Sequence, residues 1–256
     1  MSLVLHFKAS GAGEPIVLLH GLFGSASNWG SVAKQLQQDY RVVRADLRNH
    51  GDSPHAKSMS YREMADDVFA LLDRLALSKT HLIGHSLGGK VAMVCALLCP
   101  LRVQQLIVVD SAPVAYGRGF DDIIESLRAL PLDEIPDRKA ADRWLASRIE
   151  DASLRSFLLQ NLRFAEGRYR WRIDLEAIAA NRDTMCGFPQ LDSYYSGPVV
   201  FIRGEKSRYV REEHQPQIKR SFPNATLLTV PEAGHWPHSE QPERFMDLLS
   251  RSLGRD

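Results

Sequence analysis

Short runs of apolar, often β-branched residues alternate along this chain with longer stretches in which apolar residues recur every three or four positions. Such alternation is typical of βαβ units, which build a mostly parallel sheet flanked by helices. We expect strands at residues 15–19, 41–45, 81–84, 105–109, 198–202 and 225–230, joined by an N-terminal edge strand at 3–7. The pattern therefore predicts an α/β fold.

Three helices are the clearest. Residues 61–75 place Met64, Val68 and Leu71 on one face, and Ser60 can cap the first turn. Residues 87–98 form an apolar run typical of a buried helix that ends before a proline, and residues 243–253 follow another proline as a C-terminal helix.

The alternation breaks between residues 115 and 191, where helical stretches with balanced charge appear and no strong strand does. We interpret this segment as a helical cap inserted between two strands of a core domain that comprises residues 1–114 and 192–256. Its larger aromatic residues either pack on the core or line a substrate cavity, and we favour packing. They are Phe120, Trp144, Phe157, Phe164 and Trp171.

Composition narrows the classes of partner. A length of 256 residues allows one large core with an insertion. Thirty-two basic residues against 31 acidic ones give a net charge of +1, which is too weak to attract nucleic acid or an anionic membrane. Cys95, Cys99 and Cys186 lack CxxC spacing, so we expect reduced thiols rather than disulfides or a zinc site. We expect a small-molecule partner, and neither a metal nor a cofactor.

The N-terminal residues lack the charged start and the run of about 7 to 15 apolar residues that export requires. Nor does any apolar run approach the roughly 20 residues that span a bilayer. A cytoplasmic protein is therefore expected, and the sequence does not indicate its oligomeric state.

The segment Gly84-His85-Ser86-Leu87-Gly88 joins an expected strand directly to an expected helix. This is the setting of a nucleophile elbow, a tight turn that exposes a serine hydroxyl above the edge of a sheet. Glycine suits both ends, because the turn strains the backbone and larger side chains would collide with neighbouring elements. We expect Ser86 to be a nucleophile; the alternative is a glycine-rich turn that carries an ordinary surface serine.

A serine hydroxyl is a poor nucleophile until a base takes its proton, so a histidine must come from elsewhere in the fold. His235 is the candidate because it follows the last expected strand, which gives the chain order serine, acid, histidine. We expect structural roles for His50, His85 and His238. A hydrogen bond that holds its own loop is expected for His20.

The loop His20-Gly21-Leu22-Phe23-Gly24-Ser25 follows the first buried strand. A backbone N–H from this loop can converge with the N–H of Leu87 on the oxygen of a tetrahedral intermediate. We assign this oxyanion hole to Leu22 and Leu87, with Phe23 as the second choice for the loop donor. The alternative is a glycine-permitted turn without a catalytic role.

The acid is the least regular part of the pattern. After the expected strand at 198–202, the place where such sites usually carry an aspartate holds Ser207, whose neutral hydroxyl cannot stabilise an imidazolium as a carboxylate does. The strand at 105–109 runs into Asp110, and adjacent parallel strands end at the same edge of a sheet. We assign the acid to Asp110, with Ser207 as an auxiliary hydrogen-bond partner of Asp110 or His235. Glu205 is the second candidate, and turn capping is the alternative role for Asp110.

Three stretches carry a resemblance to a known family. They are Asp46-Leu47-Arg48-Asn49-His50-Gly51-Asp52-Ser53, Gly84-His85-Ser86-Leu87-Gly88-Gly89-Lys90-Val91-Ala92-Met93 and Gly234-His235-Trp236-Pro237-His238. With them, nearly the whole chain resembles the α/β-hydrolase family, and more narrowly the small bacterial esterases of the YbfF type. The resemblance implies the triad Ser86, Asp110 and His235, a helical cap over the site, and activity on short acyl esters or acyl thioesters. We interpret the polar turn at 46–53 as a packed structural loop.

We therefore expect a serine carboxylesterase that hydrolyses short-chain acyl esters, or thioesters, through an acyl-enzyme intermediate. Two alternatives stay open because a fold does not determine a substrate. One is a carbon–carbon bond hydrolase or lyase on the same scaffold. The other is a ligand-binding receptor that keeps a hydrolase pocket and turns over slowly or not at all.

Overall fold

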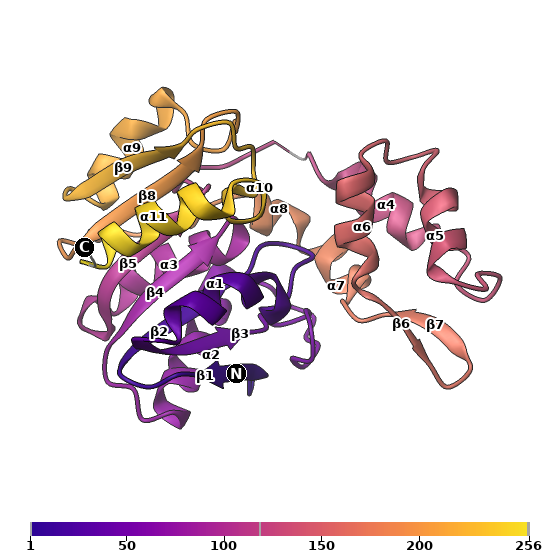
Figure 1. The fold of residues 1–256 in the computed structure, drawn as a ribbon, viewed down its shortest axis with the longest axis horizontal. Coiled ribbons are helices and arrows are strands. Elements are labelled where there is room, and N and C mark those ends of the chain that lie inside the picture. Colours follow the sequence, from indigo (N-terminus) through magenta and orange to yellow (C-terminus); the bar gives the residue numbers. More distant parts are fainter. Residues whose placement is uncertain (1, 118, 255–256) are drawn as a thin grey trace.

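A seven-stranded sheet forms the centre of the computed structural model, which describes residues 2–117 and 119–254 (Figure 1). The strand order across the sheet is β1-β3-β2-β4-β5-β8-β9. β1 runs antiparallel to β3, and every other neighbouring pair is parallel. The strands are β1 (Phe7–Ser10), β2 (Glu14–Leu19), β3 (Tyr40–Ala45), β4 (Thr80–His85), β5 (Val103–Val109), β8 (Val199–Gly204) and β9 (Ala225–Val230). The expected α/β class and the six parallel strands are confirmed.

The edge strand was expected at residues 3–7 and lies instead at Phe7–Ser10, so that prediction is wrong. Upstream of it, backbone N–H groups bond to side chains, and the carbonyl oxygen of His6 accepts the N–H of Asp46, directly after β3. The N–H of Leu3 donates to Asp67 Oδ1 at 2.5 Å, and the N–H of His6 donates to Ser53 Oγ at 2.9 Å. These side chains replace the ladder partners that a sheet would offer.

Helices cover both faces of the sheet. On one face, α1 (Gly30–Leu36) and α11 (Pro242–Ser252) pack on Ile16 and Leu18 of β2. On the other face, α2 (Tyr61–Arg74) and α3 (Leu87–Leu98) pack on the alternate residues Val17 and Leu19. This period of two is expected of a strand buried on both sides. The remaining core elements are η1 (Ala26–Trp29), η2 (Pro100–Arg102), η3 (Glu212–His214), α9 (Gln215–Ser221) and α10 (Pro237–Glu240).

The chain between β5 and β8 lies outside this sheet. It forms α4 (Asp121–Arg128), α5 (Arg138–Leu145), α6 (Ala152–Leu159), β6 (Leu162–Ala165), β7 (Arg168–Trp171), α7 (Leu175–Ala180) and α8 (Arg182–Cys186). Figure 1 shows α4 to α7 and the two strands gathered beside the sheet, past its edge. In the described part of the chain, no helix is both long enough and apolar enough to cross a bilayer.

The hairpin of β6 and β7 corrects the expectation that this segment contains helices alone. Its register places Leu162 opposite Trp171 and Phe164 opposite Tyr169, with arginines on the other face. The turn residues Glu166 and Gly167 both have positive φ, +53° and +78°, as a tight two-residue hairpin turn requires. Strands of four residues rich in arginine are too short and too charged for the apolar pattern to reveal them.

Candidate active site

Ser86 lies in the turn between β4 and α3 with φ +51° and ψ −114°, a conformation that L-residues rarely adopt. The turn is closely packed: a Cβ at Gly84 would lie 2.1 Å from the carbonyl oxygen of Gly88, and a Cβ at Gly88 would lie 2.5 Å from that of His20. Glycine is therefore required at both ends. The side chain of Ser86 stays partly exposed above the sheet edge.

Three side chains from distant parts of the chain meet at this edge. Nε2 of His235 lies 3.1 Å from Ser86 Oγ, and Nδ1 of the same ring lies 2.6 Å from Asp110 Oδ2. Ser86 follows β4, Asp110 follows β5, and His235 lies in the loop after β9. The carboxyl ends of parallel strands are where open α/β sheets place their sites. The structure thus brings together the three residues that the sequence singles out.

Asp110 is fully buried, and each of its oxygens has a donor from β8 or the loop after it. Oδ1 accepts the N–H of Gly204 at 3.1 Å, and Oδ2 accepts the hydroxyl of Ser207 at 2.5 Å. Ser207 therefore bonds to Asp110 rather than to His235. Glu205, the second candidate acid, is exposed and accepts the N–H of Glu232 at 2.9 Å.

Two further residues hold His235 in place: Tyr209 contacts its imidazole, and His85, for which we expected a structural role, bonds to its backbone. The ring of Tyr209 stacks on the imidazole, with centroids 3.9 Å apart and planes 21° from parallel. Nε2 of His85 donates to the carbonyl oxygen of His235 at 2.7 Å. Burial, with the neighbouring His235 and His238, lowers the pKa of His85 well below its usual range, so this ring is neutral. Nothing in the sequence around Tyr209 indicates that its ring stacks on a histidine from a different loop.

The backbone donors expected of an oxyanion hole lie at the same place. Leu22 and Leu87 line the pocket that contains Ser86, and among the described residues neither N–H has a recorded hydrogen-bond acceptor. Phe23, the second choice, donates its N–H to Nε2 of His50 at 3.2 Å. The N–H of Phe23 is therefore engaged, which favours Leu22 over Phe23 as the loop donor.

The polar loop at residues 46–53 supports the loop that carries Leu22. Asp46 Oδ1 accepts the N–H of Ala26 at 2.6 Å, and His50 accepts the N–H of Phe23. In return, Nε2 of His20 accepts the N–H of Leu47 at 3.0 Å. These cross-links agree with the interpretation of the segment as a packed structural loop.

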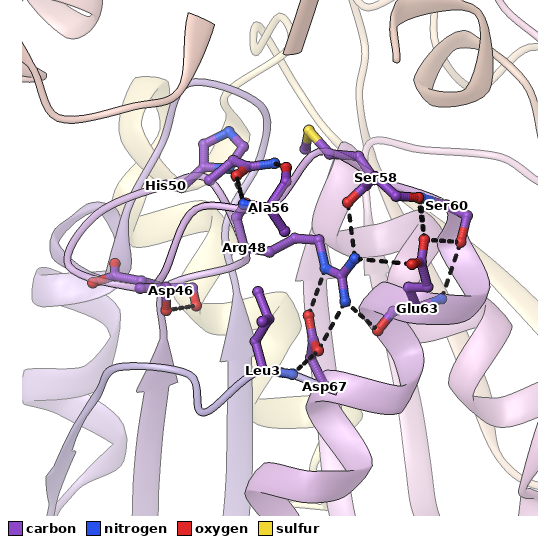
Figure 2. Close-up of polar contacts among 12 residues, drawn as sticks. Leu3, Asp46, Arg48, His50, Ala56, Ser58, Ser60, Glu63 and Asp67 are labelled. Atoms are coloured by element: carbon purple, nitrogen blue, oxygen red, sulfur yellow. Dashed lines mark hydrogen bonds and ion pairs between the residues drawn. The ribbon is translucent and has the colours of Figure 1, made fainter. Parts of the chain in front are cut away.

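Arg48 anchors this loop in the core (Figure 2). Its guanidinium is 1% exposed and bonds twice to Asp67 of α2, at 2.7 and 2.9 Å, and once to the carbonyl oxygen of Ser58 at 2.8 Å. Its Nη2, which bonds to Asp67 Oδ1, also donates to the carbonyl oxygen of Glu63 at 3.2 Å. Figure 2 shows the side chain pointing from the loop to the first turns of α2.

Replacing Arg48 with methionine is expected to lower the free energy of unfolding by about 3–5 kcal/mol, because it leaves the Asp67 carboxylate buried without its partner. Urea denaturation measures the change. The matched control is Arg62→Met, an exposed position on α2, which is expected to stay within about 0.5 kcal/mol of the wild type. A loss below about 1 kcal/mol for Arg48→Met contradicts an anchoring role.

Two neighbouring cavities share lining residues close to Ser86. The smaller, about 140 Å³, contains Ser86 and His235 and is mainly apolar. The larger, about 830 Å³, is a groove of mixed polar and apolar lining between α6 and the core residues 236–240. Phe157 of α6 and Trp236 border both, with ring centroids 5.9 Å apart. An ester bound at Ser86 therefore lies in an apolar chamber, with a second, mixed groove directly beside that chamber.

The groove has a charge imbalance. Asp151 and Glu240 line it, and no lysine or arginine is among its lining residues in the described chain. Burial lowers the pKa of His238 to about 3 and also lowers that of His20, so both rings are neutral at physiological pH.

The aromatic residues of the cap divide between the two expected roles. Trp144 and Trp171 pack against the main hydrophobic cluster, as we favoured. Phe120 and Phe157 pack there and also line the pocket of Ser86. Phe164 is 62% exposed, so the packing prediction is wrong for it, because its hairpin projects beyond the cap helices (Figure 1).

One group of described residues has the spacing of metal ligands: His6, Asp46 and Asp52. Its acceptors are already engaged, because Asp46 receives the N–H groups of Ala26 and Asp52. The guanidinium of Arg172 also pairs with Asp52 at 2.6 Å. These contacts balance the charge of the group with protein donors. Among the described residues, Cys95, Cys99 and Cys186 form no disulfide.

Comparison with known proteins agrees with this geometry. A family model described as alpha/beta hydrolase fold matches residues 14–242. The chain is 44% identical over 246 residues to the sn-1-specific diacylglycerol lipase ABHD11 of Mus musculus, covering 93% of this chain and 80% of that protein. It is 33% identical over 241 residues to Esterase YbfF of Escherichia coli (strain K12), covering 94% and 93%. The chain therefore belongs to the alpha/beta hydrolase fold family.

A solved structure described as a marine microorganism esterase superposes with a TM-score of 0.96 at 39% identity, covering 98% of this chain and all of that one. The fold, the resemblance to YbfF-type esterases and the enzyme class, a carboxylic ester hydrolase, are confirmed at this level.

Proposed function

We propose that this enzyme is a serine carboxylesterase that acts through an acyl-enzyme intermediate. The hydroxyl of Ser86 attacks the ester carbonyl while His235 Nε2 takes its proton, which then passes to the departing alcohol. His235 next takes a proton from water, which attacks the acyl carbonyl and releases the acid. The observation that carries the proposal is the continuous chain of contacts from Ser86 Oγ through His235 to Asp110.

The N–H groups of Leu22 and Leu87 are proposed to hold the oxygen of the tetrahedral intermediate. Leu87 is the first residue of α3, so the partial positive charge at the start of that helix adds to its N–H. Both residues line the pocket of Ser86, which supports the assignment.

The acyl half is proposed to enter the apolar chamber. We treat residues 1–114 and 192–256 as the core domain and residues 115–191 as the cap, whose Phe120, Ile123 and Phe157 line that chamber. Its volume of about 140 Å³ lies below the roughly 300–1,000 Å³ of pockets that enclose drug-sized ligands. A short acyl chain fits this space.

The alcohol or thiol half is proposed to leave through the larger groove, between α6 and residues 236–240. Because Asp151 and Glu240 line it and no lysine or arginine is among its described lining residues, a neutral leaving group is preferred over an anionic one. The substrate class is therefore a short-chain ester, or a thioester, of an uncharged alcohol or thiol. A cytoplasmic location stays a prediction from the sequence.

Butyryl esters of glycerol and of glycerol 3-phosphate test this preference, because they differ mainly in the charge of the alcohol half. The glycerol ester is expected to have a kcat/KM about 10-fold higher at low ionic strength, a difference that added salt reduces. Ser156→Arg, which adds a cation to the groove, is expected to narrow the gap, whereas Ser147→Arg, which lies outside the groove, is not. Equal rates at low salt contradict the placement of the alcohol half.

A panel of esters and thioesters, run with the wild type and Ser86→Ala in parallel, tests the function itself. Multiple turnovers of short-chain esters that disappear in the variant support the proposal. Two outcomes contradict it. Failure on p-nitrophenyl acetate and butyrate by the folded protein favours carbon–carbon bond cleavage on this scaffold. Tight binding of an ester without turnover favours a receptor.

A further inference from the structure

Lys90 is the only charged residue of α3, and it lies one helical turn after Ser86. Its side chain is 2% exposed. The ammonium donates to three carbonyl oxygens: those of Val114 at 2.8 Å, Cys186 at 3.0 Å and Gly187 at 2.6 Å. All three N–H bonds of the group are therefore used, and every acceptor is backbone.

These three acceptors lie on the two connections between core and cap. Val114 belongs to the segment that leaves β5 for the cap, and Cys186 and Gly187 lie where α8 ends and the chain returns to β8. The N–H of Tyr116 also donates to the carbonyl oxygen of Cys186 at 2.8 Å, which joins the two connections directly. One ammonium on the helix that follows Ser86 thus bonds to both connections between core and cap, which we call the two crossings.

The same connections form a wall of the acyl chamber. Lys90, Tyr116 and Cys186 line it beside Ser86. The ammonium lies 4.2 Å from the centre of the Tyr116 ring, a cation–π distance. Tyr61 of α2, another lining residue, donates its hydroxyl to the carbonyl oxygen of Met185 at 2.7 Å. A shift of either crossing would move this wall.

We propose that Lys90 is a positioning residue that fixes both crossings of the cap and thereby limits the length of acyl chain that the chamber accepts. This inference rests on the proposed esterase function. It assigns Lys90 no contact with the reacting atoms, because its three N–H bonds already have acceptors.

The number of hydrogen bonds that Lys90 can donate to the two crossings depends on its charge. Burial lowers the pKa of Lys90 to about 7. The ionisable groups that face it are the phenols of Tyr61 and Tyr116, whose pKa values burial raises, and the thiol of Cys186; among the described residues no carboxylate pairs with it. The neutral amine has two N–H bonds instead of three, so one of the three carbonyl oxygens loses its donor and the two crossings are held less firmly as pH rises through about 7.

The readout is the ratio of kcat/KM for p-nitrophenyl butyrate to that for p-nitrophenyl decanoate. The chemical step at Ser86 is common to both esters, so its own pH dependence cancels in this ratio. In the wild type the ratio is expected to fall severalfold between pH 6 and pH 8.5. In Lys90→Met it is expected to be about 10-fold lower than in the wild type at pH 6, chiefly through a lower KM for decanoate, and to be independent of pH.

Lys90→Arg keeps the charge throughout this range, so its ratio is expected not to change with pH. The control is Lys34→Met, an exposed position on α1, which is expected to keep the ratio and pH profile of the wild type. A ratio in the wild type that is flat with pH, or one in Lys90→Met that equals the wild-type value, overturns the proposal.

These failures differ from a failure of the esterase function. If Lys90 has no positioning role, butyrate is still hydrolysed and only the chain-length ratio stays unchanged. If the function is wrong, butyrate is not hydrolysed by any of the proteins. Should Lys90→Met not fold, the wild-type pH profile of the ratio decides alone.

Discussion

Replacing Ser86 with alanine lowers kcat for p-nitrophenyl butyrate by ~10⁴-fold or more, because the variant has no atom that can form the acyl-enzyme. The residual rate comes from water attacking an ester that the oxyanion donors still hold. Steady-state kinetics with near-ultraviolet circular dichroism separates this loss from unfolding.

The control for this variant is Ser111→Ala. Ser111 lines the same pocket, and its hydroxyl has no recorded bond to His235, so its kcat is expected to stay within about 3-fold of the wild type. A folded Ser86→Ala protein that retains a tenth or more of the wild-type kcat would contradict the role of Ser86.

Replacing Asp110 with asparagine lowers kcat by ~10⁴-fold, whereas Ser207→Ala lowers it by about 10-fold or less. The carboxylate accepts the Nδ1–H of His235 and stabilises the imidazolium that forms when Ser86 loses its proton. An amide removes that charge, and its NH₂ group favours the wrong tautomer of the ring. In Ser207→Ala the carboxylate keeps His235 and the N–H of Gly204 as partners.

This comparison also decides between Asp110 and the serine that occupies the more usual position of the acid. Thermal unfolding of both variants shows whether burial of the altered side chain disturbs the fold. Small and equal losses at positions 110 and 207 would overturn the assignment of the acid to Asp110.

The sequence predicts the sheet and the candidate triad because both depend on local rules. Apolar runs bounded by turns mark parallel strands, and parallel strands deliver their C-terminal residues to one edge. That rule alone predicts that Asp110 and His235 lie close together. The glycines around Ser86 add a local steric signature.

The parts that the sequence does not predict depend on contacts between distant segments. Tyr209 stacks on His235, and Lys90 bonds to residues 24 to 97 positions away; no periodicity marks either pairing. The edge strand shifted because side chains of Ser53 and Asp67 bond the residues before it. The arginine-rich hairpin of the cap gives an apolar signal too short to separate from a helix.

Labelling with a fluorophosphonate, followed by peptide mapping, tests the central claim most directly. We expect one label per chain on Ser86, with esterase activity lost in proportion to labelling and no label on Ser86→Ala. A label on another residue, or full activity in a protein labelled completely at Ser86, would contradict it.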